Sequence, residues 1–91
     1  MKIALICTEK LPVPPIRGGA IQVLIDGVLP YLNERNEVTV FGITDPDLDP
    51  VEIRNGIEYI RVPQEDYVNQ IHDALALKFA EGVSYDLVHV F

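Results

Sequence analysis

The sequence predicts an α/β fold: an open, mainly parallel β-sheet with flanking helices and one β-hairpin. The apolar run at residues 3–7 is typical of a strand covered on both faces, as in a parallel sheet. An amphipathic stretch and a second apolar strand follow it, which is the order of a right-handed crossover unit. The pair Asn55-Gly56 between two apolar-rich runs is the strongest short-range hairpin signal.

The first half of the chain contains a strand, a helix and a strand. The first strand is predicted at residues 2–8, and a proline-rich loop at 9–19 excludes helix. A helix is predicted over 20–35, because apolar residues recur there at i, i+3, i+4, i+7, i+8 and i+11. We expect these six to form one stripe packed on the sheet: Ile21, Leu24, Ile25, Val28, Leu29 and Leu32. The second strand is predicted at 37–43.

The second half adds the hairpin, another helix and a last strand. The hairpin is predicted at residues 51–54 and 57–62, and its second strand is expected to extend the main sheet. The second helix is predicted at 66–81, with Gly82 at its C′ position. Its expected inner stripe is Val68, Ile71, Leu75 and Phe79, with Ala74 beside it. Residues 86–91 form the last predicted strand.

The length fits one small domain or a part of a larger one. The predicted element order is only the opening of an α/β sheet, and further site residues would be expected after Phe91. We therefore expect residues 1–91 to be a partial N-terminal domain, a fragment of a longer protein. A sheet edge exposed at that point is a template for strand pairing, so self-association is expected.

Composition excludes several classes of function. The formal net charge is −7 with no cluster of Lys or Arg, which argues against nucleic-acid binding and against anionic membrane surfaces. No apolar stretch is long enough for a signal peptide or a transmembrane segment, so a cytoplasmic location is expected. The single Cys7 is interpreted as a buried small hydrophobe rather than a nucleophile.

No metal site is predicted. The acidic segment at residues 45–49 resembles the start of a calcium loop. The match fails because Pro50 stands where that loop requires Gly, and Gly56 stands where its bidentate Glu should be. We interpret this segment as a solvated acidic loop.

The candidate binding site is the stretch at residues 17–22, which closes the proline-rich loop and opens the first helix. Two glycines lack Cβ atoms, and the unpaired N–H groups and dipole of a helix start suit a phosphate. The predicted substrate- or phosphate-binding residues are Arg17, Gly18, Gly19 and Gln22. The alternatives are a plain turn at the glycines, a solvated Arg17 and a solvent-facing Gln22. A dinucleotide fingerprint is absent.

An ordered set of segments resembles a known family. The apolar start, the proline-rich loop, Gly18-Gly19 before a helix, and the runs at 37–40 and 86–89 resemble the N-terminal domain of GT-B retaining glycosyltransferases of family 4. The runs at 8–14 and 17–22 look most like a spore-coat member from bacilli. The likeness covers all 91 residues. It implies a Rossmann-like sheet that is an incomplete N-terminal half of a GT-B fold, with the C-terminal donor-binding domain absent from this chain.

The resemblance also implies an activity. The donor would be a nucleotide-sugar such as a UDP- or GDP-sugar, the partner a glycan acceptor, and the product a spore-coat or cell-surface polysaccharide, without a metal or other cofactor. Gly18 and Gly19 match the family's glycine loop, which faces the donor diphosphate or the acceptor. Catalytic residues stay unknown, because the family's cleft histidine lies beyond Phe91, and His89 is interpreted as structural.

Two alternatives belong to other classes of function. The first is a non-catalytic structural component of the spore coat that keeps the glycosyltransferase fold. The second is another nucleotide-binding α/β domain, such as a flavodoxin-like module. Fold alone does not fix function. The 91-residue fragment by itself is expected to be inactive.

Overall fold

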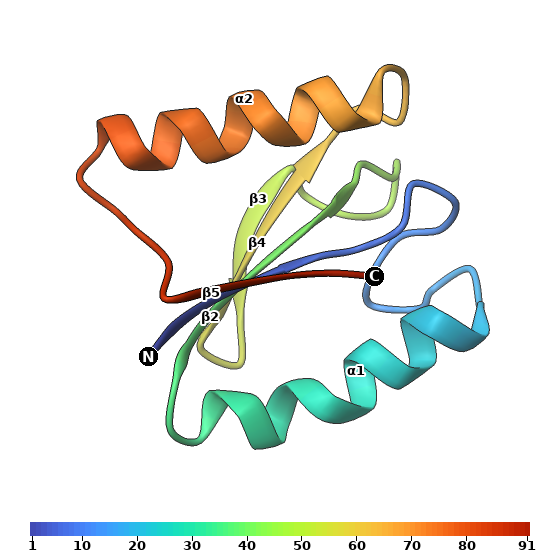
Figure 1. Cartoon of the computed structure of the whole chain (residues 1–91). Helices are drawn as coiled ribbons and strands as arrows, with labels where there is room; N and C mark the ends of the chain where they lie inside the picture. Colours follow the sequence, from blue (N-terminus) through green and yellow to red (C-terminus); the bar gives the residue numbers. More distant parts are fainter.

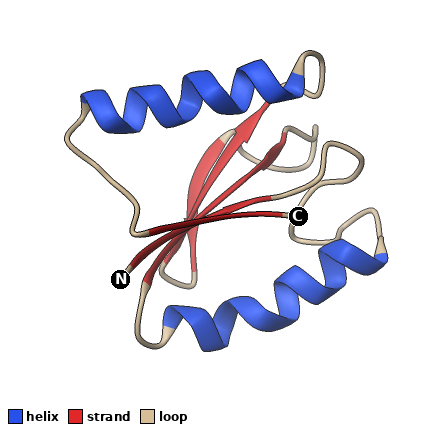
Figure 2. Cartoon of the chain, viewed as in Figure 1, coloured by secondary structure: helices blue, strands red, loops and turns tan.

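The computed structural model describes all 91 residues and contains one five-stranded sheet with a helix on each face (Figures 1 and 2). The elements in chain order are β1 (Lys2–Ile6), α1 (Ala20–Asn33), β2 (Glu37–Ile43), β3 (Val51–Arg54), β4 (Ile57–Val62), α2 (Tyr67–Ala80) and β5 (Leu87–Val90). The predicted fold class, a mainly parallel α/β sheet with one hairpin, is confirmed.

The strand order is β3-β4-β2-β1-β5, and only β3 runs antiparallel to its neighbour. The chain moves from β1 through α1 to β2 on one side of β1, and α2 later returns it to β5 on the other side. The two helices therefore lie on opposite faces of the sheet (Figure 1). In such sheets ligands bind beyond the carboxyl ends of the strands, where the strand order reverses. Here that position lies between β1 and β5.

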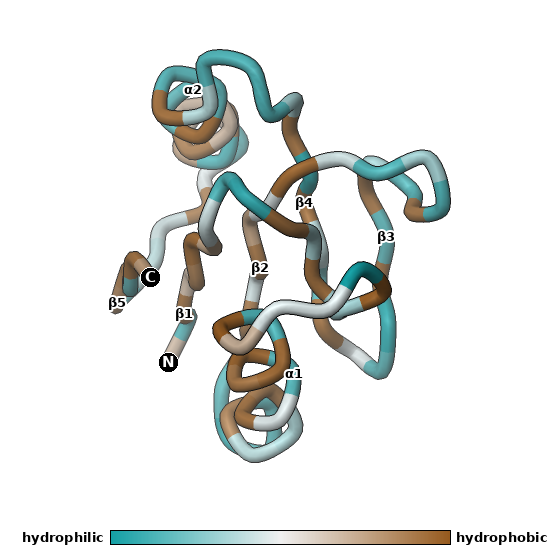
Figure 3. The backbone as a smooth tube through the Cα atoms, turned by 90° about the vertical axis from the view of Figure 1, so that its right-hand side faces the viewer, coloured by the Kyte–Doolittle hydropathy of each residue, from teal (hydrophilic) through white to brown (hydrophobic).

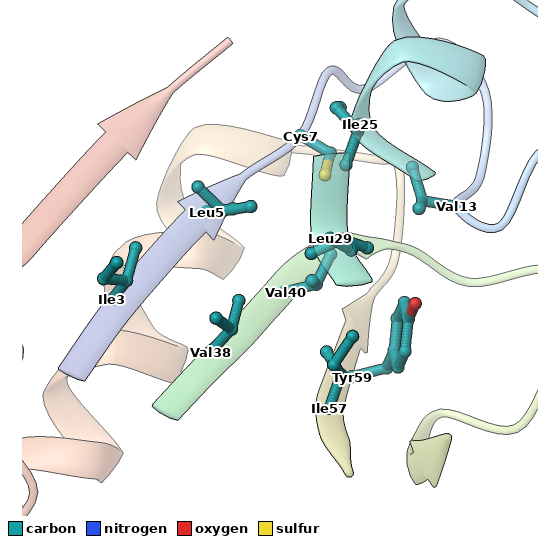
Figure 4. Close-up of a cluster of buried hydrophobic side chains, with 10 residues drawn as sticks. All are labelled: Ile3, Leu5, Cys7, Val13, Ile25, Leu29, Val38, Val40, Ile57 and Tyr59. Atoms are coloured by element: carbon teal, nitrogen blue, oxygen red, sulfur yellow. The ribbon is translucent and has the colours of Figure 1, made fainter. Parts of the chain in front are cut away.

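The core consists of two apolar layers, one on each face of the sheet. Figure 4 shows the layer under α1, which contains Ile3, Leu5, Cys7, Val13, Ile25, Leu29, Val38, Val40, Ile57 and Tyr59. The layer under α2 contains Ala4, Ile6, Phe41, Ile43, Val62, Tyr67 and Ile71. The loops that join β2 to β3 and β4 to α2 are mainly hydrophilic (Figure 3). Burial on both faces explains the continuous apolar runs of β1 and β2.

The hairpin follows the prediction residue for residue. Asn55 and Gly56 have φ angles of 52° and 80°, the left-handed pair that a two-residue hairpin turn requires. β4 pairs with β2, so the second strand of the hairpin extends the main sheet. Gly82 closes α2 with φ 86°, as its C′ position requires.

The predicted apolar stripe of α1 is wrong in half of its members. Ile25 and Leu29 are buried and Leu32 is partly buried, but three others are exposed: Ile21, Leu24 and Val28. Gln22 takes an inward position instead and is 3% exposed. A single helix lying on a sheet buries only a narrow line of side chains, and here that line passes through 22, 25 and 29. The helix ends at Asn33, two residues before the predicted boundary.

The predicted stripe of α2 needs a similar correction. Val68 and Phe79 are exposed, whereas Ile71 is buried and Leu75 is partly buried. Tyr67 is buried at the start of the helix, where its hydroxyl donates a hydrogen bond to the carbonyl of Cys7 at 2.6 Å. That bond draws the first turn of α2 over the end of β1, which fixes the buried face of the helix.

Two substitutions in α1 distinguish the observed buried line from the stripe predicted from the sequence. Leu29→Ala should lower the free energy of unfolding by about 2–5 kcal/mol, because it empties a buried position. Leu24→Ala is its matched control and should change that free energy by about 0.5 kcal/mol or less, because Leu24 is exposed. Urea titrations of both variants measure the difference. Equal losses would show that the stripe predicted from the sequence packs on the sheet after all.

Candidate functional site

The β1–α1 loop, residues 7–19, leaves the sheet where the strand order reverses. Four side chains from outside the loop hold it by donating to its backbone carbonyls. The bonds are Tyr67 Oη to Cys7 O at 2.6 Å, Gln64 Nε2 to Glu9 O at 2.6 Å, Gln22 Nε2 to Leu11 O at 3.3 Å and Arg61 Nη2 to Val13 O at 2.9 Å. Every second carbonyl from 7 to 13 is thus held by a side chain, which gives this irregular segment a fixed path.

At the start of α1 the free backbone donors begin at Gly19. The N–H of Gly18 donates to the carbonyl of Pro15 at 3.1 Å, so it is already paired. The N–H groups of Gly19, Ala20 and Ile21 have no backbone acceptor, because they precede the first hydrogen bond of α1. The positive end of the helix dipole lies at the same place. The arrangement can bind an anion through backbone N–H groups.

The two glycines differ in why they lack a side chain. Both have positive φ angles, 84° at Gly18 and 99° at Gly19. A Cβ at Gly19 would overlap Oε1 of Gln22 and lie 2.8 Å from Cδ1 of Leu11, whereas a Cβ at Gly18 would meet nothing within 4 Å. A side chain at position 19 would therefore displace Gln22 and Leu11, whereas the space beside Gly18 is open.

Gln22 is a buried link between α1 and the loop. Its Nε2 donates to Oγ1 of Thr8 at 2.9 Å and to the carbonyl of Leu11 at 3.3 Å. The interpretation that Gln22 faces solvent is wrong, because the loop covers its side chain. A direct contact between Gln22 and a ligand stays a prediction, and its amide nitrogen is already bound within the protein.

Arg17 is paired with the acidic loop, residues 45–49. Its guanidinium donates to both carboxylate oxygens of Asp45 at 3.1 Å each, and also to Asp47. The hydrogen bond from Arg17 holds the pKa of Asp45 below its ordinary value of 3.8. Arg17 and most of the acidic loop are exposed to solvent, as interpreted from the sequence, but they are also paired with each other. A phosphate contact of Arg17 stays a prediction and requires an exchange of partners.

A cavity of about 400 Å³ opens at the carboxyl ends of β1 and β5. Its lining is mostly apolar and comes from the end of β1, the first turns of α2 and the end of β5, while Glu9 and Lys10 supply polar groups. Thr8 lines this cavity and also accepts the hydrogen bond from Gln22, so it connects the cavity to the start of α1. Sequence reasoning missed the cavity, because only the fold brings α2 over the end of β1.

No catalytic side chain emerges from the remaining candidates. Burial raises the pKa of the Cys7 thiol to about 12, so it stays uncharged and fits the predicted role of a buried hydrophobe. His72 is exposed, and the ring of His89 packs edge-on against Phe91 with 4.6 Å between centroids. The structure has no group of three His, Cys, Asp or Glu side chains able to hold a metal ion. Neither helix has the length and hydropathy needed to cross a membrane.

Comparison with known proteins identifies two relatives. The chain is 48% identical over 91 residues to "Putative glycosyltransferase YtcC" and 44% identical over 90 residues to "Spore coat protein SA", both of Bacillus subtilis (strain 168). The chain is homologous to these two proteins. It spans about a fifth of the length of each, 21% and 22%. The resemblance to a glycosyltransferase and to a spore coat protein of bacilli, predicted from the sequence, is confirmed. No protein-family profile matches the chain.

The glycine pair provides a test of local packing. Gly19→Ala should destabilise the fold by about 1 kcal/mol more than Gly18→Ala, because both meet the positive-φ penalty but only the former displaces Gln22 and Leu11. Thermal and urea unfolding of the two variants measure the difference. Equal stabilities would mean that Gln22 does not occupy the space beside Gly19.

The Arg17–Asp45 pair predicts a pH dependence. Because the folded-state pKa of Asp45 is lowered, its contribution to stability is complete above the unfolded value of about 3.8 and is lost as the pH falls through the folded value. Asp45→Asn should therefore flatten the decline in the free energy of unfolding between about pH 5 and pH 2. Asp49→Asn, on the same loop but outside the ion pairs, is the control and should keep the wild-type slope. A wild-type slope in Asp45→Asn would contradict the pairing.

Proposed function

We propose that the chain forms one wall of the cleft of a nucleotide-sugar-dependent glycosyltransferase of the retaining GT-B type, which makes a spore-coat or cell-surface polysaccharide. The observation that carries this proposal is the 48% identity, over the whole chain, to the relative named as a putative glycosyltransferase. The doubly wound sheet and the cavity where its strand order reverses also support it.

In this proposal the start of α1 binds the diphosphate of the donor. The N–H groups of Gly19, Ala20 and Ile21 donate to its oxygens, and the open side of Gly18 lets the phosphate approach the backbone. Transfer breaks the bond between the sugar and the diphosphate and forms one between the sugar and an acceptor hydroxyl, which loses its proton, and negative charge develops on the departing diphosphate. Fixed donors at that point stabilise the transition state more than the ground state. Gln22 acts indirectly, by keeping the loop in place.

Arg17 adds a mobile charge to this site. Its guanidinium is half-exposed and bound to the carboxylates of Asp45 and Asp47. A phosphate offers the same paired oxygen geometry as a carboxylate and more negative charge. Arg17 therefore exchanges one anion for another when the donor binds. The apolar cavity beyond Thr8 receives part of the glycan acceptor, with Lys10 and Glu9 at its polar side.

The second candidate function is a non-catalytic structural component of the spore coat. It is favoured by the 44% identity to the relative named as a spore coat protein. In that role the glycines form only a turn and a helix start. The two functions differ in whether the first turn of α1 binds phosphate.

An amide NMR titration of the 91-residue chain with UDP, UDP-glucose and inorganic phosphate tests the proposal. We expect saturable shifts at Gly19, Ala20 and Ile21, and at Arg17 and the acidic loop that it leaves, with a dissociation constant on the order of 1 mM. The start of α2, which follows the carboxylates of Glu65 and Asp66, is the internal control and should not respond.

Two results would decide against it. Equal shifts at both helix starts would indicate non-specific anion binding. No shift at the start of α1 in a folded sample would favour the structural role in the spore coat.

A further inference from the structure

We propose that Arg61 is a positioning residue for the candidate site: its buried guanidinium sets where the start of α1 lies relative to the acidic loop. Arg61 belongs to β4, and it touches neither the glycines nor the expected ligand position. What the start of α1 binds rests on the proposed function, but the geometry set by Arg61 does not.

One side chain joins the two loops. Nη2 of Arg61 donates to the carbonyl of Val13 at 2.9 Å, and Nη1 donates to the carbonyl of Asp49 at 2.7 Å. The backbone N–H of Arg61 also donates to the carbonyl of Pro50 at 2.7 Å. Val13 belongs to the β1–α1 loop, and Asp49 ends the acidic loop. The distance between these loops is thus fixed by the width of a rigid, planar guanidinium.

The segment between Val13 and Arg17 transmits this constraint. It contains Pro14 and Pro15, whose rings fix their φ angles. The N–H of Ile16 donates to Pro14 O at 2.7 Å and that of Gly18 to Pro15 O at 3.1 Å, so the segment is restricted in how far it can absorb a shift at Val13 before the glycines move. On the outer side Arg17 bridges back to Asp45 and Asp47, so two arginines hold the same pair of loops, one from inside and one from the surface.

The burial and contacts of Arg61 indicate that it orients the two loops rather than only stabilising the fold. Its side chain is 1% exposed, Nη1 lies 3.5 Å from Oε2 of Glu52, and the guanidinium carbon lies 4.9 Å from the centroid of the Tyr59 ring. Its Nε has no hydrogen-bond partner. A buried ion pair can often be replaced by apolar residues without loss of stability. An apolar residue could not donate the two short hydrogen bonds that Arg61 makes to carbonyls of two separate loops.

The test is Arg61→Lys, which keeps the charge but removes the fork that reaches both carbonyls. In the ligand-free protein we expect the pKa of Asp45, followed by NMR, to rise toward 3.8 as the Arg17 pair loosens. The amide signals of Gly18 and Gly19 should shift as well. The affinity for UDP at the start of α1 should fall at least about fivefold.

Lys78→Met is the matched control. It breaks the other partly buried ion pair, between Lys78 and Glu58 at 3.0 Å, on the face of the sheet that carries α2. We expect it to leave the Asp45 pKa, the glycine signals and the UDP affinity unchanged. If Arg61→Lys loses stability while those readouts stay at wild-type values, Arg61 only stabilises the fold and the proposal is overturned.

The ligand-free readouts separate this proposal from the proposed function. Absence of UDP binding in the wild type would remove the glycosyltransferase role, while the Asp45 pKa and the glycine signals would still decide the role of Arg61. If Arg61→Lys does not fold, hydrogen exchange of the wild type replaces it. Each rate, divided by the intrinsic rate of that group, gives an opening free energy: equal opening free energies for the Arg61 guanidinium and the Gly18 amide support the coupling, and clearly different ones overturn it.

Discussion

Burying a charged guanidinium costs several kcal/mol of lost hydration, and contacts within the protein must offset that cost. At Arg61 the offsetting contacts are the hydrogen bonds to the carbonyls of Val13 and Asp49, the ion pair with Glu52 and the contact with the ring of Tyr59. The parallel sheet places β1 beside β2, but it does not fix the loops that leave their carboxyl ends. Arg61 holds those loops against each other from the interior, and Arg17 does so from the surface, so the shape of the candidate site depends on both arginines.

The rest of the β1–α1 loop also depends on hydrogen bonds from side chains outside it. Prolines remove backbone donors, so the segment cannot satisfy its own carbonyls and must take donors from elsewhere. Tyr67, Gln64 and Gln22 supply them at Cys7, Glu9 and Leu11, as Arg61 does at Val13. A stretch without secondary structure thus becomes part of the fold. Side chains hold its carbonyls, and the unpaired N–H groups lie at the start of α1.

Features set by local chemistry could be predicted from the sequence, and those set by distant contacts could not. The hairpin at Asn55-Gly56 was predictable because its positive φ angles concern two adjacent residues. The buried line of α1 was not, because Gln22 turns inward only to meet a loop that precedes it. The burial of Arg61 could have been predicted from the sequence. Arg61 continues the alternation of inward residues from Ile57 and Tyr59, and this places an arginine on a buried face of the sheet.

The glycine pair led to the candidate site in the sequence, and the structure shows how its residues differ in their contacts. At Gly19 both the φ angle of 99° and the packing oppose a side chain, since Gln22 and Leu11 occupy the space that a Cβ would need. Gly18 has open space and a paired N–H, so its missing side chain leaves room beside the backbone. An incoming phosphate would use the room at Gly18 and the donors that begin at Gly19. The positive φ angles favour glycine at both positions, so the proposed binding role of Gly18 adds to a structural role rather than replacing it.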